Sequence, residues 1–181
     1  GNMTNANSGA VAISVDATIN GLTVGRGSGN QILNTVFGYN ALANGTTGNF
    51  NVAIGPNSLY SNTIGASNVA IGRNSLYSNI NGSYNTASGY QALYSNISGL
   101  YNVASGREAL YSNTTGASNT ATGNRALYHN TSGTYNVATG NEALSNNISG
   151  SYNVATGNHS LYSNTTGMHN SAIGGRALHF N

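Results

Sequence analysis

The chain has 181 residues, no cysteine and a formal net charge of +2. Only 4% of its residues are charged, against roughly 25% in a typical soluble domain, so Asn, Ser, Thr and Gly must provide most of the polar surface. The lack of cysteine excludes disulfide bonds and thiolate metal sites. The small positive charge argues against nucleic acid and anionic membrane surfaces as partners.

Residues 1–33 precede the regular part of the sequence, and we expect them to form an extended segment. Within it, residues 10–19 (AVAISVDATI) have the composition of a strand, whereas residues 25–29 (GRGSG) lack the Lys-Ser/Thr ending of a phosphate-binding loop. The segment is predicted either to cap the first repeat or to add as a strand to a neighbouring subunit, which would give a head-to-tail filament. The longest apolar run, residues 10–13, is too short to span a bilayer, so no membrane insertion is expected.

A repeat with a spacing of 17 residues begins at Asn34 and continues to Asn181. Each unit follows the phrase N-x-A-x-G-x-x-[AS]-L-x-x-N-x-x-G-x-x, in eight full copies and a shortened ninth. Constant spacing without insertions indicates that each unit is locked to its neighbours, as the coils of a solenoid are. The opening Asn of the units is Asn34, Asn51, Asn68, Asn85, Asn102, Asn119, Asn136, Asn153 and Asn170.

The unit is too short and too rich in glycine for a pair of helices, so we predict an all-β parallel β-solenoid with one repeat per coil. Segments such as NVAIG and NTATG place β-branched residues at alternate positions, as a strand does. The neighbouring Ala109 and Leu110 are both small or apolar, and a strand would not bury them together. A second strand or a short helical turn is therefore expected there, followed by a corner at the Asn-Thr-Thr-Gly stretch.

Stacking the coils brings equivalent residues into columns with a spacing of about 4.8 Å. One column is leucine and is the predicted core: Leu42, Leu59, Leu76, Leu93, Leu110, Leu127, Leu144, Leu161 and Leu178. Another is largely tyrosine: Tyr60, Tyr77, Tyr94, Tyr111, Tyr128 and Tyr162. We expect the tyrosine rings to stack and hold the coils in register, with recognition of sugar rings as the alternative role.

Two further columns suggest surface chemistry. In one, acid and base alternate, which predicts a ladder of solvated ion pairs: Glu108, Arg125, Glu142, His159 and Arg176. In the other, Asn-x-Ser/Thr sequons recur at Asn96, Asn113, Asn130, Asn147 and Asn164. These asparagines are possible glycosylation sites if the protein is made by a glycosylating secretory system. The alternative is that Asn and Thr are simply good corner residues.

No catalytic or metal site is expected. Glu108 and Glu142 fall two coils apart, close to the carboxylate separation of an inverting glycosidase, but Arg125 between them would keep both ionised. The four histidines occupy different columns and would not converge on a metal ion. The only aspartate, Asp16, lies outside the repeats. We therefore expect a protein without enzymatic activity and without a cofactor.

The recurring N-[VT]-A-[IST]-G of residues 51–181 resembles the stacked head repeats of trimeric autotransporter adhesins and related repeats of bacteriophage tail fibres. Residues 19–27 (INGLTVGRG) resemble the segment that precedes such repeats in tail fibres. The resemblance implies an extracellular, cell-surface or virion fibre, often a parallel homotrimer. We expect a structural fibre or filament protein that assembles with copies of itself, as a homopolymer or homotrimer, and serves in adhesion. The alternative is a homotrimeric receptor-binding module that recognises cell-surface glycans.

Overall fold

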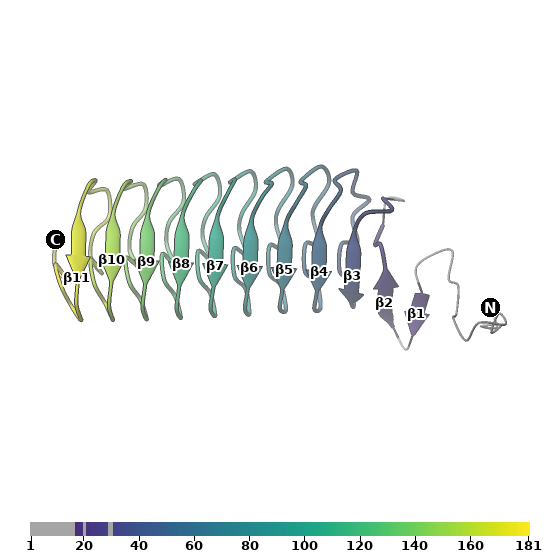
Figure 1. The fold of residues 1–181 in the computed structure, drawn as a ribbon, viewed down its shortest axis with the longest axis horizontal. Coiled ribbons are helices and arrows are strands. Elements are labelled where there is room, and N and C mark those ends of the chain that lie inside the picture. Colours follow the sequence, from purple (N-terminus) through teal and green to yellow (C-terminus); the bar gives the residue numbers. More distant parts are fainter. Residues whose placement is uncertain (1–16, 20, 29–30) are drawn as a thin grey trace.

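The fold is a rod of stacked coils (Figure 1), described by the computed structural model for residues 17–19, 21–28 and 31–181. All of its strands belong to one sheet, in the order β1 to β11. From β3 onward neighbouring strands are parallel, which confirms the predicted all-β parallel solenoid with one repeat per coil. The described residues contain no helix, so the helical turn considered for the second half of each coil is absent there.

Each coil contributes one short strand to a face of the rod. The strands are β3 (Thr35–Gly38), β4 (Val52–Ile54), β5 (Val69–Ile71), β6 (Thr86–Ser88), β7 (Val103–Ser105), β8 (Thr120–Thr122), β9 (Val137–Thr139), β10 (Val154–Thr156) and β11 (Ser171–Ile173). Equivalent positions of the repeat pair directly, as Ala104 does with Ala121. The central alanine of the strand points into the coil, and its two neighbours point to the outer face.

An antiparallel hairpin lies at the N-terminal end of the solenoid (Figure 1). Its strands are β1 (Ala17–Ile19) and β2 (Leu22–Gly25), and the turn between them contains Gly21 at a φ of 81°. Strand β2 pairs antiparallel with β3, so the hairpin covers the N-terminal edge of the first coil. Of residues 10–19, which were expected to form a strand, Ala17–Ile19 pair with β2 of the same chain. Residues 1–16 lie outside the described residues, so docking of the N-terminal segment on a neighbouring subunit stays a prediction.

The core of each coil is a narrow contact between one leucine and two small residues. Leu42 to Leu161 in the leucine column are fully buried, and the strand alanines face them. In the last coil Leu178 is 49% exposed. The leucine column therefore runs through the interior as a continuous apolar spine, and the facing strand position holds alanine in every coil except the first, where it holds Val36.

In the segment that follows the strand, residues with a left-handed φ alternate with residues with an ordinary negative φ. Glu108 and Leu110 have φ values of 56° and 52°, in the left-handed region that L-residues generally avoid, and the same two positions repeat this geometry in every coil. The alternation turns Ala109 and Leu110 to the same side, so both are buried. Bonds between coils stabilise it: the Glu108 N–H donates to the Tyr90 carbonyl at 2.9 Å, and the Leu110 N–H donates to the Ala126 carbonyl at 3.0 Å.

Two columns of buried asparagines fix the corners of the coils. In one, Asn113 Nδ2 donates to Asn96 Oδ1 at 2.8 Å and to the Gly116 carbonyl at 3.0 Å. In the other, the backbone N–H and Nδ2 of Asn119 both donate to Asn102 Oδ1, at 3.0 and 3.2 Å. Among the described residues, every buried side-chain nitrogen and oxygen has a hydrogen-bond partner. The polar interior is therefore built of amide ladders that run along the rod.

Glycine is required where these ladders meet the corner. A Cβ atom on Gly116 would lie 2.5 Å from the Gly133 carbonyl oxygen and 2.7 Å from Asn130 Nδ2, and it would also clash with Asn113 Oδ1. The same arrangement recurs at the equivalent glycine of the neighbouring coils. The Asn-x-x-Gly spacing of the repeat therefore reflects a corner so tight that an amide side chain fills the space of a missing Cβ.

The same burial bears on the sequons. Asn96, Asn113, Asn130 and Asn147 are fully buried, and Asn164 is 2% exposed. The nitrogen that would carry a glycan donates in each case to the asparagine of the preceding coil and to a corner carbonyl. A glycan would replace one of the two hydrogens of this nitrogen and so remove one of these bonds, and the buried column has no room for it, so the folded coil does not accommodate the glycosylation considered from the sequence. The alternative interpretation, that asparagine is here a corner residue, agrees with the geometry.

Candidate functional site

The charged column holds one buried carboxylate. Glu108 is 6% exposed, and its Oε2 accepts a hydrogen bond from Arg125 Nε at 2.6 Å. Its Oε1 accepts two bonds from Arg107, at 2.9 Å from Nη2 and 3.1 Å from Nε. Burial alone raises the pKa of Glu108, but the hydrogen bonds and charges of Arg125 and Arg107 outweigh it and hold that pKa below its ordinary value. A carboxyl group held ionised in this way is a poor general acid.

The rest of the column forms separate contacts. Glu142 Oε2 lies 3.1 Å from His159 Nε2, and the Arg125 guanidinium lies over the Tyr128 ring at 5.3 Å from its centroid. Arg176 is exposed. The sequence predicted solvated ion pairs between neighbours along this column. Glu108 and Arg125 are such neighbours, but the Glu108 carboxylate is buried rather than solvated, because Arg107 and Arg125 both bond to it. The sequence analysis missed the partnership with Arg107, because that residue belongs to the adjacent column.

Replacing Glu108 with glutamine is expected to lower the free energy of unfolding by roughly 1 to 2 kcal/mol at pH 7, because an amide nitrogen would face the guanidinium groups. Since the folded-state pKa of Glu108 is lowered, its contribution is fully present above the ordinary glutamate pKa and is lost as the pH falls through the lowered value. Urea unfolding of both proteins at several pH values measures this: the difference should shrink in acid. Glu142→Gln is the matched control, with a smaller expected loss. Equal stability of wild type and Glu108→Gln at pH 7 would refute the effect.

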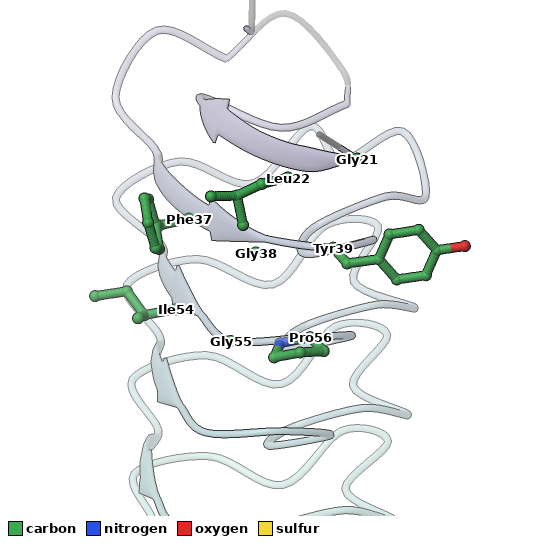
Figure 2. A pocket seen from close by; sticks show the side chains of 8 residues that line it. All are labelled: Gly21, Leu22, Phe37, Gly38, Tyr39, Ile54, Gly55 and Pro56. Carbon is green, nitrogen blue, oxygen red and sulfur yellow. The ribbon is translucent and has the colours of Figure 1, made fainter. Parts of the chain in front are cut away.

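An apolar pocket of about 360 Å³ lies where the hairpin meets the first coils (Figure 2). Leu22 of β2, Phe37 and Ile54 form one side, and Tyr39 and Pro56 extend along the other. The floor is backbone, because the repeat places glycines at the residue that closes or follows the strand. None of the described residues that line the pocket is charged, so it is suited to receive an apolar group.

A second, more polar pocket of about 420 Å³ lies along a corner, lined by Ser112, His129, Thr131, Asn146, Ile148 and Thr165. The His129 ring packs nearly perpendicular to the Tyr128 ring, at 4.7 Å between centroids. Of the other histidines, His159 and His179 come within 5.9 Å of each other between ring centroids. No group of three or more potential metal ligands occurs in the described part of the chain.

The predicted tyrosine ladder is stacked ring on ring. From Tyr60 to Tyr128 successive centroids are 5.1 Å apart and the ring planes are nearly parallel. Burial and the neighbouring phenols raise the pKa of Tyr111. Ser145 interrupts the column, and Tyr162 beyond it stacks on His179. Within the ladder each ring covers the face of the next, so the ladder presents ring edges and hydroxyl groups, rather than faces, to a ligand.

A second aromatic ladder, which the sequence analysis missed, occupies the position just before the opening asparagine. Tyr84 stacks on Tyr101 at 5.0 Å, and Tyr135 stacks on Tyr152, also at 5.0 Å. His169 continues the second stack. The recurring phrase Gly-x-Tyr-Asn was the signal in the sequence that could have revealed it.

The chain was compared with protein-family models, curated proteins and solved structures, and no significant match was found in any of the three. None of the described residues belongs to a helix with the length and apolar character needed to cross a bilayer. Function is therefore argued from the geometry of the coils and from the side chains that they present.

Proposed function

We propose that the protein is a non-enzymatic structural rod of an extracellular fibre, which assembles with copies of itself and takes part in adhesion to surfaces. The observation that carries this proposal is the outer face of the sheet, where two columns of uncharged side chains follow the whole rod. The first column is Thr35, Val52, Val69, Thr86, Val103, Thr120, Val137, Val154 and Ser171. The second is Phe37, Ile54, Ile71, Ser88, Ser105, Thr122, Thr139, Thr156 and Ile173.

Parallel sheets are usually covered on both faces, and here the single chain covers only one. On the outer face Phe37 is 48% exposed, Ile71 is 42% exposed and Val103 is 41% exposed. Neither column carries a charge that would oppose association. A second copy of the chain is a suitable partner, because it repeats at the same spacing and burial of such a face gains about 25 cal/mol per Å².

Other features support a structural rather than a catalytic role. The ionised Glu108 is held by two arginines, and the buried amides of the described residues are all hydrogen-bonded within the rod. A stack of nine coils at about 4.8 Å per coil makes a rigid spacer on the order of 40 Å long. The resemblance to adhesin and tail-fibre repeats adds the proposed location on a cell surface or virion.

The solution mass tests self-association. At micromolar concentration we expect light scattering to give a defined oligomer, with a trimer as the first candidate, or a polymer. The variant Ile71→Arg should dissociate it, because a guanidinium would have to be buried in the interface. Thr115→Arg, on an exposed corner, is the matched control and should leave the mass unchanged. A monomeric wild-type protein would refute the proposed assembly.

A second candidate function is recognition of cell-surface glycans. It is favoured by the second aromatic ladder, whose rings are far more exposed than a structural stack requires: Tyr84, Tyr101 and Tyr135 are each more than half exposed. Ring faces that are open to solvent are common contact surfaces for the C–H groups of sugars. This candidate is compatible with the first, since a fibre that adheres must present a binding surface.

A further inference from the structure

The second aromatic ladder is interrupted twice by serine. Reading the position before each opening asparagine gives Phe50, Ser67, Tyr84, Tyr101, Ser118, Tyr135, Tyr152 and His169. Serine recurs three coils apart, each time within the phrase Gly-Ala-Ser-Asn. All eight residues share a left-handed backbone, with φ between 57° and 62°. The backbone therefore continues unchanged through the interruptions, and only the aromatic ring is missing.

Each interruption leaves two ring faces without a neighbour. Tyr101 stacks on the ring before it and Tyr135 on the ring after it, so their other faces look toward Ser118. Two coil spacings separate these two rings, about 10 Å. Tyr101 is 57% exposed and Tyr135 is 54% exposed. One further ring placed between them would lie about one ladder spacing from each, since the rings of the stacked pairs are 5.0 Å apart.

The other tyrosine ladder provides a contrast. It is also interrupted by a serine, but Ser145 is only 5% exposed, so that interruption is closed. Ser118 and Ser67 are partly exposed, and Ser67 lies between Phe50, at 61% exposure, and Tyr84, at 55%. Only the interruptions of the second ladder are therefore open to solvent.

We propose that the interruptions at Ser67 and Ser118 are two binding sites for neutral pyranose rings of one extended polysaccharide. The proposal rests on the second candidate function and names its site. A pyranose carries C–H groups on both faces, which can stack on the two open rings, while its equatorial hydroxyl groups point out of the open edge and stay hydrated. The serine hydroxyl below can form a hydrogen bond, and the neighbouring Ala66 and Ala117 leave room for the ring.

The surroundings favour a neutral polymer. Next to Ser118 in the outward-facing part of its coil lie Ala117 and Thr120, and next to Ser67 lie Ala66 and Val69, so no charged residue directly flanks either serine. The two sites are three coils apart along one side of the rod, about 14 Å. A polymer that fills both sites binds the second intramolecularly, which raises its affinity above that of a single sugar.

The test fills both interruptions with the ring that the ladder already uses elsewhere. The double variant Ser67→Tyr with Ser118→Tyr should fold, because Tyr84, Tyr101 and Tyr135 are native at the same position with φ values of 60°, 58° and 57°. Binding is measured on an array of neutral hexopyranose oligosaccharides and by calorimetry with the best of them. We expect wild-type binding and a loss of about tenfold or more in the double variant. Ser145→Tyr, in the closed interruption, is the matched control and should bind as wild type does.

Three results would overturn the proposal. Absence of wild-type binding to every oligosaccharide of the array would do so, and so would unchanged binding by the double variant. Binding of p-cresol that is lost in the double variant, without any oligosaccharide binding, would assign the interruptions to aromatic rings instead. The solution mass is measured on the same proteins, because a monomeric wild type would count against the fibre proposal, whereas a wild-type oligomer that binds no sugar would count against the site alone.

Discussion

Replacement of Asn113 by alanine is expected to lower the free energy of unfolding by about 3 to 5 kcal/mol. The side chain donates to Asn96 Oδ1 and to the Gly116 carbonyl, and its Oδ1 accepts from Asn130 Nδ2 at 2.8 Å. Alanine would leave Asn96 Oδ1 buried without a bond, in a column to which water has no access. The Gly116 carbonyl and Asn130 Nδ2 would each lose one of two bonds and keep those with Asn102 Nδ2 and the Gly133 carbonyl. The cost of the unpaired oxygen and of the vacated space therefore adds to the net value of the three bonds that are lost.

Urea unfolding followed by circular dichroism measures this difference. The matched control is Asn158→Ala, since Asn158 is exposed and its replacement should change the stability by no more than about 0.5 kcal/mol. Asn113→Asp is a useful third variant, because it keeps the shape of the side chain and removes both N–H donors. If Asn113→Ala unfolded at the same urea concentration as Asn158→Ala, the amide ladder would not be a main source of stability.

The repeat period accounts for the part of the fold that was predictable. A constant spacing of 17 residues forces position i of one coil against position i+17 of the next, which is the register observed between β7 and β8. Contacts along the rod follow from this register, including the stack from Tyr60 to Tyr128 and the pair of Glu108 with Arg125. Prediction along a column needs only the period and no knowledge of the shape of the coil.

Contacts across a coil were not predictable in the same way. The course of the chain between the strands depends on left-handed φ values at Glu108 and Leu110, residue types for which a sequence reading does not expect them. A helical turn was the simpler way to bury Ala109 and Leu110 together. The turn is excluded because its hydrogen bonds would run within the coil, whereas the observed N–H groups of Glu108 and Leu110 donate to the neighbouring coils on either side.

Among the candidate sites, too, contacts within one column were predictable and contacts between columns were not. The charged column and the first tyrosine ladder were found because their members share one position of the repeat. The contact of Arg107 with Glu108 joins two columns, so the repeat period alone does not reveal it. The exposure of a tyrosine ring face depends on the residues packed beside it, which the period does not reveal either. Exposure separates the open interruption at Ser118 from the closed one at Ser145, and the sequence shows the two as the same substitution of serine for tyrosine.

Replacement of Leu110 by alanine is expected to lower the free energy of unfolding by about 2 to 5 kcal/mol. The side chain is fully buried, between the leucines of the two adjacent coils. The residues that face it inside the coil are small, as Ala104 and Ala109 are, and the backbone is held by bonds between coils. The coil therefore cannot close around the missing atoms, and most of the cavity should remain.

The same substitution in the last coil distinguishes the cost of the cavity from the cost of placing alanine in a left-handed backbone conformation. Leu178 is 49% exposed, so Leu178→Ala should cost less than about 1 kcal/mol. Both leucines have a left-handed φ, 52° for Leu110 and 48° for Leu178, so any effect of alanine on that conformation is shared by the two variants. The difference between their unfolding free energies, measured by urea titration, thus isolates burial and cavity formation. Equal losses in the two variants would mean that the backbone preference, rather than the leucine spine, sets the cost.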